Sequence, residues 1–194
     1  MKPSSFNTYY DDIDSDFWRN LCVEKGILRQ YDKGELFAEE GRIAKYLGYI
    51  QSGSLKYVVN LPDGTERIVG FEFAGGFVAD FPFSLYGKKS RVSIVAATPC
   101  EIYCIPTQEI SGLMKSDEEL YRVIAESSIA LFDTTYNRYI DLYIKSAKER
   151  YDELIEKHKD IFSIFSLKDI ASFLNITPTY LSRLRNVKHS QVGL

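Results

Sequence analysis

Near its C-terminal end the chain reads SLKDIASFLNITPTYLSRLR, from Ser166 to Arg185. Ser166 is a suitable N-cap for a first helix, and Asn175 can adopt the left-handed conformation that ends it. Thr177 can then cap a second helix in which Pro178 takes the first position, where its missing N–H is not needed. The spacing therefore predicts two short helices joined by a tight turn, which is a helix-turn-helix.

The apolar residues of this segment predict which faces are buried. Ile170, Leu174 and Leu181 are expected to face inward, and Ala171 is small where the second helix must cross the first closely. In a helix-turn-helix the N-terminal half of the second helix enters the major groove of DNA. Arg183 suits guanine or phosphate, and the hydroxyl side chains suit phosphates and sugars. We therefore predict DNA contacts by Thr177, Thr179, Tyr180, Ser182, Arg183, Arg185, Asn186 and Lys188. The alternative is an ordinary helical hairpin packed on the rest of the protein.

Charge is distributed unevenly along the chain. The whole sequence has a formal net charge of -3, whereas the part from Ile161 onward carries +3 and the part before it -6. A locally basic end on an acidic body is typical of a small DNA-binding module attached to a larger domain. With so few charges, chance is the alternative explanation of this excess.

The composition is that of a globular protein, with 45% hydrophobic and 26% charged residues. No run of apolar residues approaches the roughly 20 that span a bilayer, and the first residues lack the apolar segment of a secretion signal. We therefore expect a cytoplasmic protein. Cys22, Cys100 and Cys104 are too few and too scattered for a disulfide framework. Cys100 and Cys104 share one face of a predicted strand, so we expect them to pack in the core rather than bind a metal.

From Ile27 to Pro106, glycines separate short runs rich in Val, Ile, Tyr and Phe. Regularly spaced short strands with turn signals predict a β-sandwich or barrel-like domain. Pro62-Asp63-Gly64 is a good hairpin turn, because proline presets φ and glycine allows a positive φ. The segment before this domain, up to about Glu24, is predicted to be a short packed helix. The predicted strands cover residues 46–50, 55–59, 67–73, 92–96 and 101–105.

After Pro106 the sequence becomes helical in character. The stretch from Asp117 to Lys159 is too long for one ordinary helix, so we expect at least two. Within it, residues recur at steps of three and four along one stripe. Such a stripe either packs on the β-domain or forms the seam of a two-helix dimer. Its members, the candidate dimer interface, are Leu120, Ile124, Ser128, Leu131, Thr135, Tyr139 and Leu142.

Several strings together resemble one known family. Tyr49–Lys56 reads YIQSGSLK, Gly75–Asp80 reads GGFVAD, and Ala96–Ile102 reads AATPCEI. With the helix-turn-helix, these strings resemble the Crp/Fnr family of transcription regulators over nearly the whole chain from about Ile27. The helix-turn-helix is most similar to a short variant in Bacteroidetes-type members, whose hallmark IAxxLxITPxxLSR begins here at Ile170.

The resemblance implies an α+β fold with three parts. An N-terminal helix and a double-stranded, jelly-roll-like β-roll would occupy residues 1–116, a long dimerisation helix residues 117–147, and the helix-turn-helix domain residues 148–194. No room remains between Lys159 and Ser166 for the family's usual hairpin, and only nine residues follow Arg185, so we expect no full wing. Because phosphate contacts supply much of the affinity for DNA, binding should depend strongly on dimerisation and salt.

The resemblance also implies where an effector would bind. In ligand-binding members a small residue and a helix N-terminus admit a cyclic phosphate, an acidic residue binds the ribose 2′-hydroxyl, and an arginine pairs with the phosphate. Here Ala79 and Asp80 match the first two, but Ser90 stands at the arginine position. Arg91 comes one residue later, and a shift of one residue on a strand reverses the side chain's face. The sequence therefore disfavours cyclic AMP, predicts no cofactor, and leaves the effector unidentified. The candidate effector residues are Gly76, Phe77, Val78, Ala79, Asp80, Ser90, Arg91 and Thr135.

A second hypothesis for this region is an apolar effector pocket lined by clustered aromatic residues. A cavity filled entirely by the rings themselves would contradict it. The residues concerned are Phe71, Phe73, Phe77, Phe81 and Phe83.

Enzymatic and metal chemistry find little support. His158 and His189 are the only histidines and belong to no ligand cluster, and Cys22 alone near the N-terminus cannot hold an iron–sulfur cluster. No Gly-x-Ser-x-Gly elbow or Walker-type loop occurs. We therefore expect no enzyme, no metal and no membrane association.

The sequence predicts a homodimeric transcription regulator of Crp/Fnr type that binds a palindromic operator in double-stranded DNA through the major groove. An unidentified effector in the β-roll would control it, and RNA polymerase is a further candidate partner. The alternative is a ligand-binding or protein-interaction β-roll whose degenerate helix-turn-helix no longer binds DNA.

Overall fold

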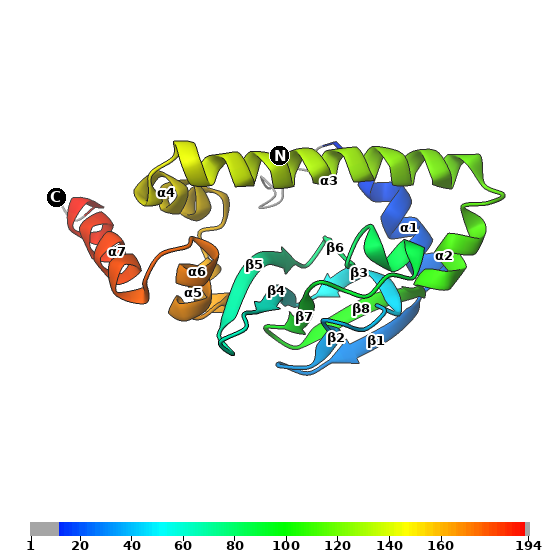
Figure 1. Ribbon diagram of the computed structural model, residues 1–194, viewed down its shortest axis with the longest axis horizontal. Helices are drawn as coiled ribbons and strands as arrows, with labels where there is room; N and C mark the ends of the chain where they lie inside the picture. The colour runs from blue at the N-terminus through cyan, green and yellow to red at the C-terminus, as the bar shows by residue number, and fades with distance from the viewer. Residues whose placement is uncertain (1–11, 193–194) are drawn as a thin grey trace.

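The structure is a computed structural model that describes residues 12–192, with side chains up to Asn186. Its longest element is α3 (Glu118–Ile144), which begins at the N-cap Asp117 and has two acidic residues in its first turn. A β-domain lies beneath one part of α3, and the C-terminal helices gather at its far end (Figure 1). The helix thus connects the two parts of the chain that the sequence assigns to effector and DNA.

The β-domain is a roll of two antiparallel sheets, each with four strands. Apolar side chains that alternate along the strands point between the sheets, and Ile50, Leu55, Ile94 and Ile102 there are fully buried. In order across the first sheet the strands are β1 (Ile27–Tyr31), β8 (Cys100–Pro106), β3 (Tyr46–Ser52) and β6 (Phe77–Val78). Across the second they are β2 (Leu36–Ala38), β7 (Ser93–Ala96), β4 (Ser54–Asn60) and β5 (Glu66–Phe73).

All five predicted strands are confirmed, as β3, β4, β5, β7 and β8. The predicted hairpin turn joins β4 to β5: Gly64 has φ +80°, and its N–H donates to the carbonyl oxygen of Leu61 over 2.9 Å. The sequence did not predict β1, β2 and β6. These are two to five residues long, and β1 is almost entirely exposed, so no alternation of apolar and polar residues reveals it.

Three helices cover the outer face of the first sheet: α1 (Ser15–Lys25), α2 (Thr107–Leu113) and the first turns of α3. Trp18 and Cys22 of α1 are buried against them, as the predicted packed helix requires. Leu120 and Ile124 also pack in this cluster, 1% and 5% exposed. The sequence left two interpretations of the stripe open, packing on the β-domain or pairing in a dimer. Leu120 and Ile124 pack on the β-domain, so their assignment to the dimer interface is wrong.

Four further helices follow α3. They are α4 (Ala147–Lys157), α5 (Ile161–Ile164), α6 (Leu167–Phe173) and α7 (Pro178–Val192). Ser146 and Glu149 form a reciprocal capping box that starts α4 directly after α3 ends, which confirms two helices between residues 117 and 159. Together with the β-roll and the long helix, α6 and α7 confirm the predicted α+β fold with a C-terminal helix-turn-helix.

Asn175, in the turn of this motif, has φ +55° and is the sole non-glycine residue with positive φ in the described part of the chain. We expect Asn175→Ala to lower the free energy of unfolding by about 1 kcal/mol, because alanine pays the full steric cost of the left-handed conformation. Asn175→Gly is the matched control and should unfold at or above the wild-type urea concentration. Equal urea midpoints for the two variants would contradict this account.

Candidate functional site

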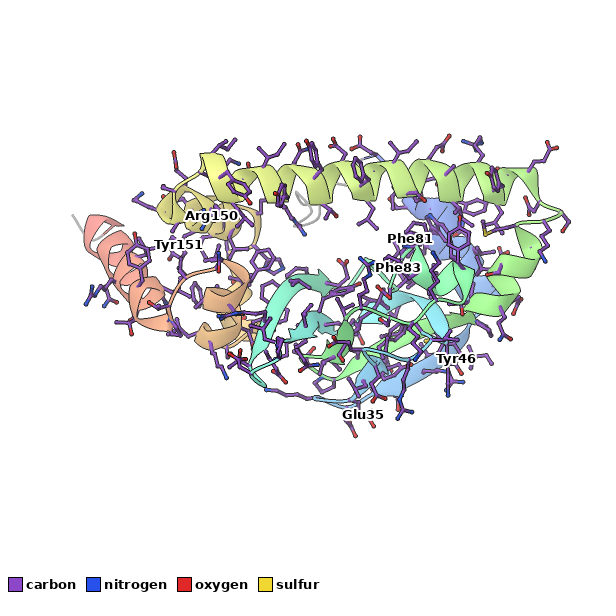
Figure 2. All side chains as sticks on the ribbon, viewed as in Figure 1. Glu35, Tyr46, Phe81, Phe83, Arg150 and Tyr151 are labelled. Carbon is purple, nitrogen blue, oxygen red and sulfur yellow. The ribbon has the colours of Figure 1, made fainter. Side chains whose placement is uncertain are left out.

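A cavity of about 260 Å³ lies between the β-roll and α3. β5, the segment from Phe77 to Phe81, α1 and one face of α3 all contribute to its walls. Figure 2 shows Phe81 on the side of the β-roll that faces α3. Five aromatic side chains line the cavity: Trp18, Tyr57, Phe71, Phe77 and Phe81.

The structure brings together four of the eight predicted effector residues. Phe77, Ala79, Asp80 and Thr135 line the cavity. Gly76 and Val78 do not line it, because they belong to the tight turn and the buried strand that support it. The hydroxyl of Thr135 donates to the Leu131 carbonyl oxygen over 2.7 Å, so its proton is engaged within its own helix.

The remaining two predicted residues are Ser90, at the arginine position, and Arg91, one residue later. Ser90 is 4% exposed, and its hydroxyl donates to the carbonyl oxygen of Val92 over 2.7 Å. Arg91 is exposed, and its guanidinium carbon lies 4.7 Å from the centroid of the Phe83 ring. Neither residue lines the cavity, although the charge of Arg91 acts to lower the pKa of Asp80.

Asp80 is a predicted member of the site whose environment is unusual for a carboxyl group. It is 8% exposed, and burial raises the pKa of its carboxyl, although the nearby Ser90 side chain and the backbone N–H and charge of Arg91 act to lower that pKa. Its Oδ2 atom is buried without a hydrogen-bond partner among the described residues. An unpaired buried acceptor is rare in folded proteins and normally marks a missing partner.

The sequence did not identify several residues of this cavity. Glu72 lines it from β5 and is 3% exposed. Tyr57 lines it from β4; its hydroxyl donates to the Ala79 carbonyl oxygen over 3.5 Å, and burial raises its pKa well above the ordinary value. Trp18 donates from Nε1 to the Ser127 hydroxyl over 2.9 Å, which joins α1 to α3 beside the cavity. The sequence did contain one signal for this site: Glu72 is an acidic residue within an otherwise apolar strand segment.

The aromatic-pocket hypothesis holds for part of its residues. Phe71, Phe77 and Phe81 line the cavity and leave it open. Phe73 instead stacks on His158, with ring centroids 3.9 Å apart, and Phe83 lies beneath Arg91. Two of the five rings therefore serve packing outside the cavity.

The helix-turn-helix has the predicted local geometry. The Ser166 side chain accepts a hydrogen bond from the Asp169 N–H, and the Thr177 hydroxyl accepts one from the Tyr180 N–H over 3.2 Å. The inward-facing residues are buried, with Leu181 0% exposed. These contacts fix the angle at which α7 leaves the turn.

The outer face of α7 is exposed to solvent at most predicted DNA-binding positions. Thr177, Thr179, Tyr180, Arg183 and Asn186 are exposed, and Ser182 is partly exposed. Arg185 is also exposed, but its guanidinium lies 4.5 Å from the centroid of the Phe162 ring in α5. The side chain of Lys188 lies outside the described residues.

The helix-turn-helix is docked on β5. The ring of Phe71 lies 4.0 Å from that of Phe165 and 5.0 Å from that of Phe173, centroid to centroid. The Ile68 N–H donates to the Ser172 hydroxyl over 2.9 Å, and Lys56 Nζ lies 2.9 Å from Asp169 Oδ1. A hydrophobic cluster with polar contacts at its border therefore joins the DNA-binding region to the β-roll.

Arg150 ties the same region to the end of α3. Its guanidinium donates to the carbonyl oxygens of Lys145, over 2.7 Å, and Leu174, over 3.1 Å. Figure 2 shows Arg150 and Tyr151 where α4 meets the C-terminal helices. A movement of α3 would consequently reach the turn of the helix-turn-helix through one side chain.

α3 also carries an unpartnered apolar stripe. The six side chains of this stripe are large and hydrophobic or aromatic, yet each is 51–74% exposed. Tyr139 and Leu142 of the predicted stripe are exposed, whereas Ser128 and Leu131 are partly buried. The exposed stripe consists of Tyr121, Ile129, Phe132, Tyr136, Tyr139 and Tyr143.

Among residues 12–192, no helix combines the length and apolar character that crossing a membrane requires. Within the same residues, no group of three or more His, Cys, Asp or Glu side chains is placed to hold a metal ion. Cys100 and Cys104 pack in the core of the β-roll, as predicted.

The sequence of this chain is similar to those of known proteins. Residues 28–117 match the cyclic nucleotide-binding domain family. A probable transcriptional activator from Rhizobium leguminosarum bv. viciae is 26% identical over 182 aligned residues, which cover 84% of this chain and 74% of the relative.

Solved structures show the same fold. FixK2 from Bradyrhizobium japonicum superposes with a TM-score of 0.74 at 20% identity, covering 86% of this chain and 85% of that one. A transcriptional regulator of the Crp/Fnr family from Eubacterium rectale gives 0.70 at 17% identity, with coverages of 94% and 86%. The likeness therefore extends beyond the β-roll to the long helix and the C-terminal helices.

Proposed function

We infer that this chain, which carries a cyclic nucleotide-binding domain and has the fold of the Crp/Fnr regulators, is a DNA-binding transcription regulator controlled by an effector in its β-roll. The observation that carries the inference is the capped second helix α7, whose N-terminal half presents exposed Thr179, Tyr180 and Arg183. A helix presented in this way fits the major groove. We propose no enzymatic activity, and we place the protein in the cytoplasm, where its DNA would be.

A homodimer is part of this proposal. The exposed stripe of α3 places Phe132, Tyr136 and Tyr143 on one side of a long helix, where a second copy can cover them. Rows of apolar residues at this spacing are typical of paired helices. Two recognition helices would then read half-sites about 34 Å apart in a palindromic operator. RNA polymerase and the division of the chain at residues 116/117 and 147/148 remain predictions.

β5 offers a route from effector to DNA. Phe71 lines the cavity and also contacts the rings of Phe173, in the helix-turn-helix, and Phe165, just before it. An occupant that moves Phe71 therefore changes how well the helix-turn-helix docks. Binding would shift the population between docked and released arrangements, which is the physical content of allosteric control.

The test is binding of the purified protein to DNA from upstream of its own gene, measured at two salt concentrations. Sequence-selective binding that weakens with salt is expected, since phosphate contacts release counterions. Binding to no fragment, including fragments selected from a random-sequence pool, would favour the interaction-module alternative, which the docking of the helix-turn-helix on β5 already makes worth testing.

The ion pair that borders the docked surface makes stability depend on pH. Burial acts to raise the pKa of Asp169, but hydrogen bonds from Lys56 and Ser166 outweigh it and leave the pKa below its ordinary value of 3.8. The carboxylate therefore adds stability above about pH 4, and this stability is lost as the pH falls through the lowered pKa. We expect Asp169→Asn to cost about 1–2 kcal/mol at neutral pH.

Urea unfolding of wild type and Asp169→Asn at pH values from about 7 down to about 3 checks this, since the difference should shrink in acid. Asp133→Asn is the control, because Asp133 is exposed on α3. A difference that stays constant with pH would show that the ion pair with Lys56 is not its source.

A further inference from the structure

Two carboxyl groups line the cavity between the β-roll and α3. Asp80 and Glu72 are 8% and 3% exposed, and both belong to its lining. The Oδ2 atom of Asp80 has no hydrogen-bond partner among the described residues. A buried acceptor without a hydrogen-bond partner raises the free energy of the folded protein. A ligand that donates a hydrogen bond to this acceptor removes that penalty, which favours binding.

Arg91 is a cation whose charge acts on Asp80, but its side chain lies over the ring of Phe83, outside the cavity lining, and its charge does not outweigh the effect of burial on the pKa of Asp80. Arg138 is the single cation in the lining, and its guanidinium lies 5.9 Å from the centroid of the Phe173 ring in the helix-turn-helix. An anionic phosphate in this cavity would therefore lie against the Asp80 carboxyl, which repels it, with Arg138 as the one cation in the lining.

The rest of the lining is largely aromatic and apolar. Trp18, Phe77 and Phe81 join Tyr57 and Phe71 around a space of about 260 Å³. Flat aromatic faces attract other rings and also cations, through the negative charge of the ring face. This lining suits a compact aromatic molecule better than a sugar phosphate.

We propose that the effector is a small, mostly aromatic or apolar molecule with a cationic or strongly hydrogen-bond-donating group that binds Asp80. Its apolar part lies among the aromatic side chains, and its donor group pairs with Asp80 Oδ2. The proposal rests on the proposed function, in which this cavity holds the effector. The site keeps an acceptor for a donor group of the ligand, at Asp80, and has serine in place of the arginine that would pair with a phosphate.

The test uses the full-length protein and pairs of probes that differ in charge but not in shape. Trp18 is the sole tryptophan of the chain and lines the cavity, so its fluorescence reports binding there. Benzamidine, an aromatic cation, should give a saturable change with a millimolar dissociation constant, as expected of a fragment of this size. Benzoate, of the same shape and opposite charge, and cyclic AMP should give none.

Asp80→Asn should weaken benzamidine binding by about 10-fold to 100-fold, because it removes the charged partner. Asp63→Asn, in the exposed turn between β4 and β5, should leave binding unchanged. Circular dichroism and the thermal midpoint establish that both variants fold. Should Asp80→Asn fail to fold, the comparison of benzamidine with benzoate on wild-type protein still decides the question.

Three results would overturn the inference: no benzamidine binding, equal or tighter binding of benzoate or cyclic AMP, or undiminished binding to folded Asp80→Asn. DNA binding is measured separately on the same preparation. If the protein binds DNA but not benzamidine, the proposed regulator function stands and the proposed effector class is wrong. Asp80-dependent benzamidine binding without any DNA binding would retain the ligand site and refute the regulator.

Discussion

Arg183→Ala is expected to weaken binding of the proposed dimer to its operator by about 2–6 kcal/mol, because each specific base contact contributes about 1–3 kcal/mol and such a dimer would make two. Arg183 is exposed in the N-terminal half of α7, two residues after the fully buried Leu181. Its neighbours Tyr180 and Thr179 are exposed as well. The burial of Leu181 against α6 thus sets the side of α7 from which Arg183 projects.

Fluorescence anisotropy with an operator fragment and a scrambled fragment measures this effect. Arg183→Lys keeps the charge and loses the planar fork, so it separates base recognition from phosphate contact. Arg19→Ala removes an exposed arginine from α1, remote from α7, and should change little. Operator affinity that survives Arg183→Ala would contradict the role given to α7.

Phe132→Glu is expected to convert the dimer into a monomer and to abolish operator binding at concentrations that saturate the wild type. Phe132 is 68% exposed at the middle of the apolar stripe of α3, and its ring stacks on that of Tyr136 with centroids 5.7 Å apart. In the proposed dimer this surface is covered by the second copy. A charge at its centre would have to be desolvated, and in a symmetric interface this happens once in each copy. Loss of the dimer removes one half-site contact from every complex.

Analytical ultracentrifugation gives the oligomeric state, and anisotropy gives the affinity for DNA. Asn137→Glu adds the same charge to an exposed position of α3 outside the stripe and should remain dimeric. A Phe132→Glu protein that sediments as the wild-type dimer would show that another surface holds the two copies together. Unfolding of the monomer is not expected, because Phe132 belongs to none of the buried clusters.

Predictions from the sequence succeeded where the deciding residues are close together along the chain. The caps of α6 and α7, the left-handed Asn175 and the turn at Gly64 each depend on residues within about four positions. Five strands were predicted because their apolar residues recur between turn signals. The short or exposed strands β1, β2 and β6 lack that pattern, and pairing with neighbours remote in sequence produces them.

The candidate site was predicted only in part. Phe77, Ala79, Asp80 and Thr135 line the cavity, but Tyr57, Glu72 and Trp18 came from elements that no local pattern connects to it. The substitution of Ser90 for an arginine was visible in the sequence. That it leaves Asp80 buried and partly unpaired was not, because burial depends on segments that meet only in the folded chain.

Three features could be predicted from the sequence without the structure: the helix-turn-helix, the order of most strands and helices, and the lack of an arginine at position 90. Each depends on residue spacing, on capping residues or on the type of a single residue. The tertiary structure alone decided that Leu120 and Ile124 face the β-roll, that Phe132 and its neighbours stay exposed, and that Phe71 meets Phe165. The physical reason is range: capping and turns act between near neighbours, whereas side-chain burial and packing are settled only when distant segments compete for the same surface.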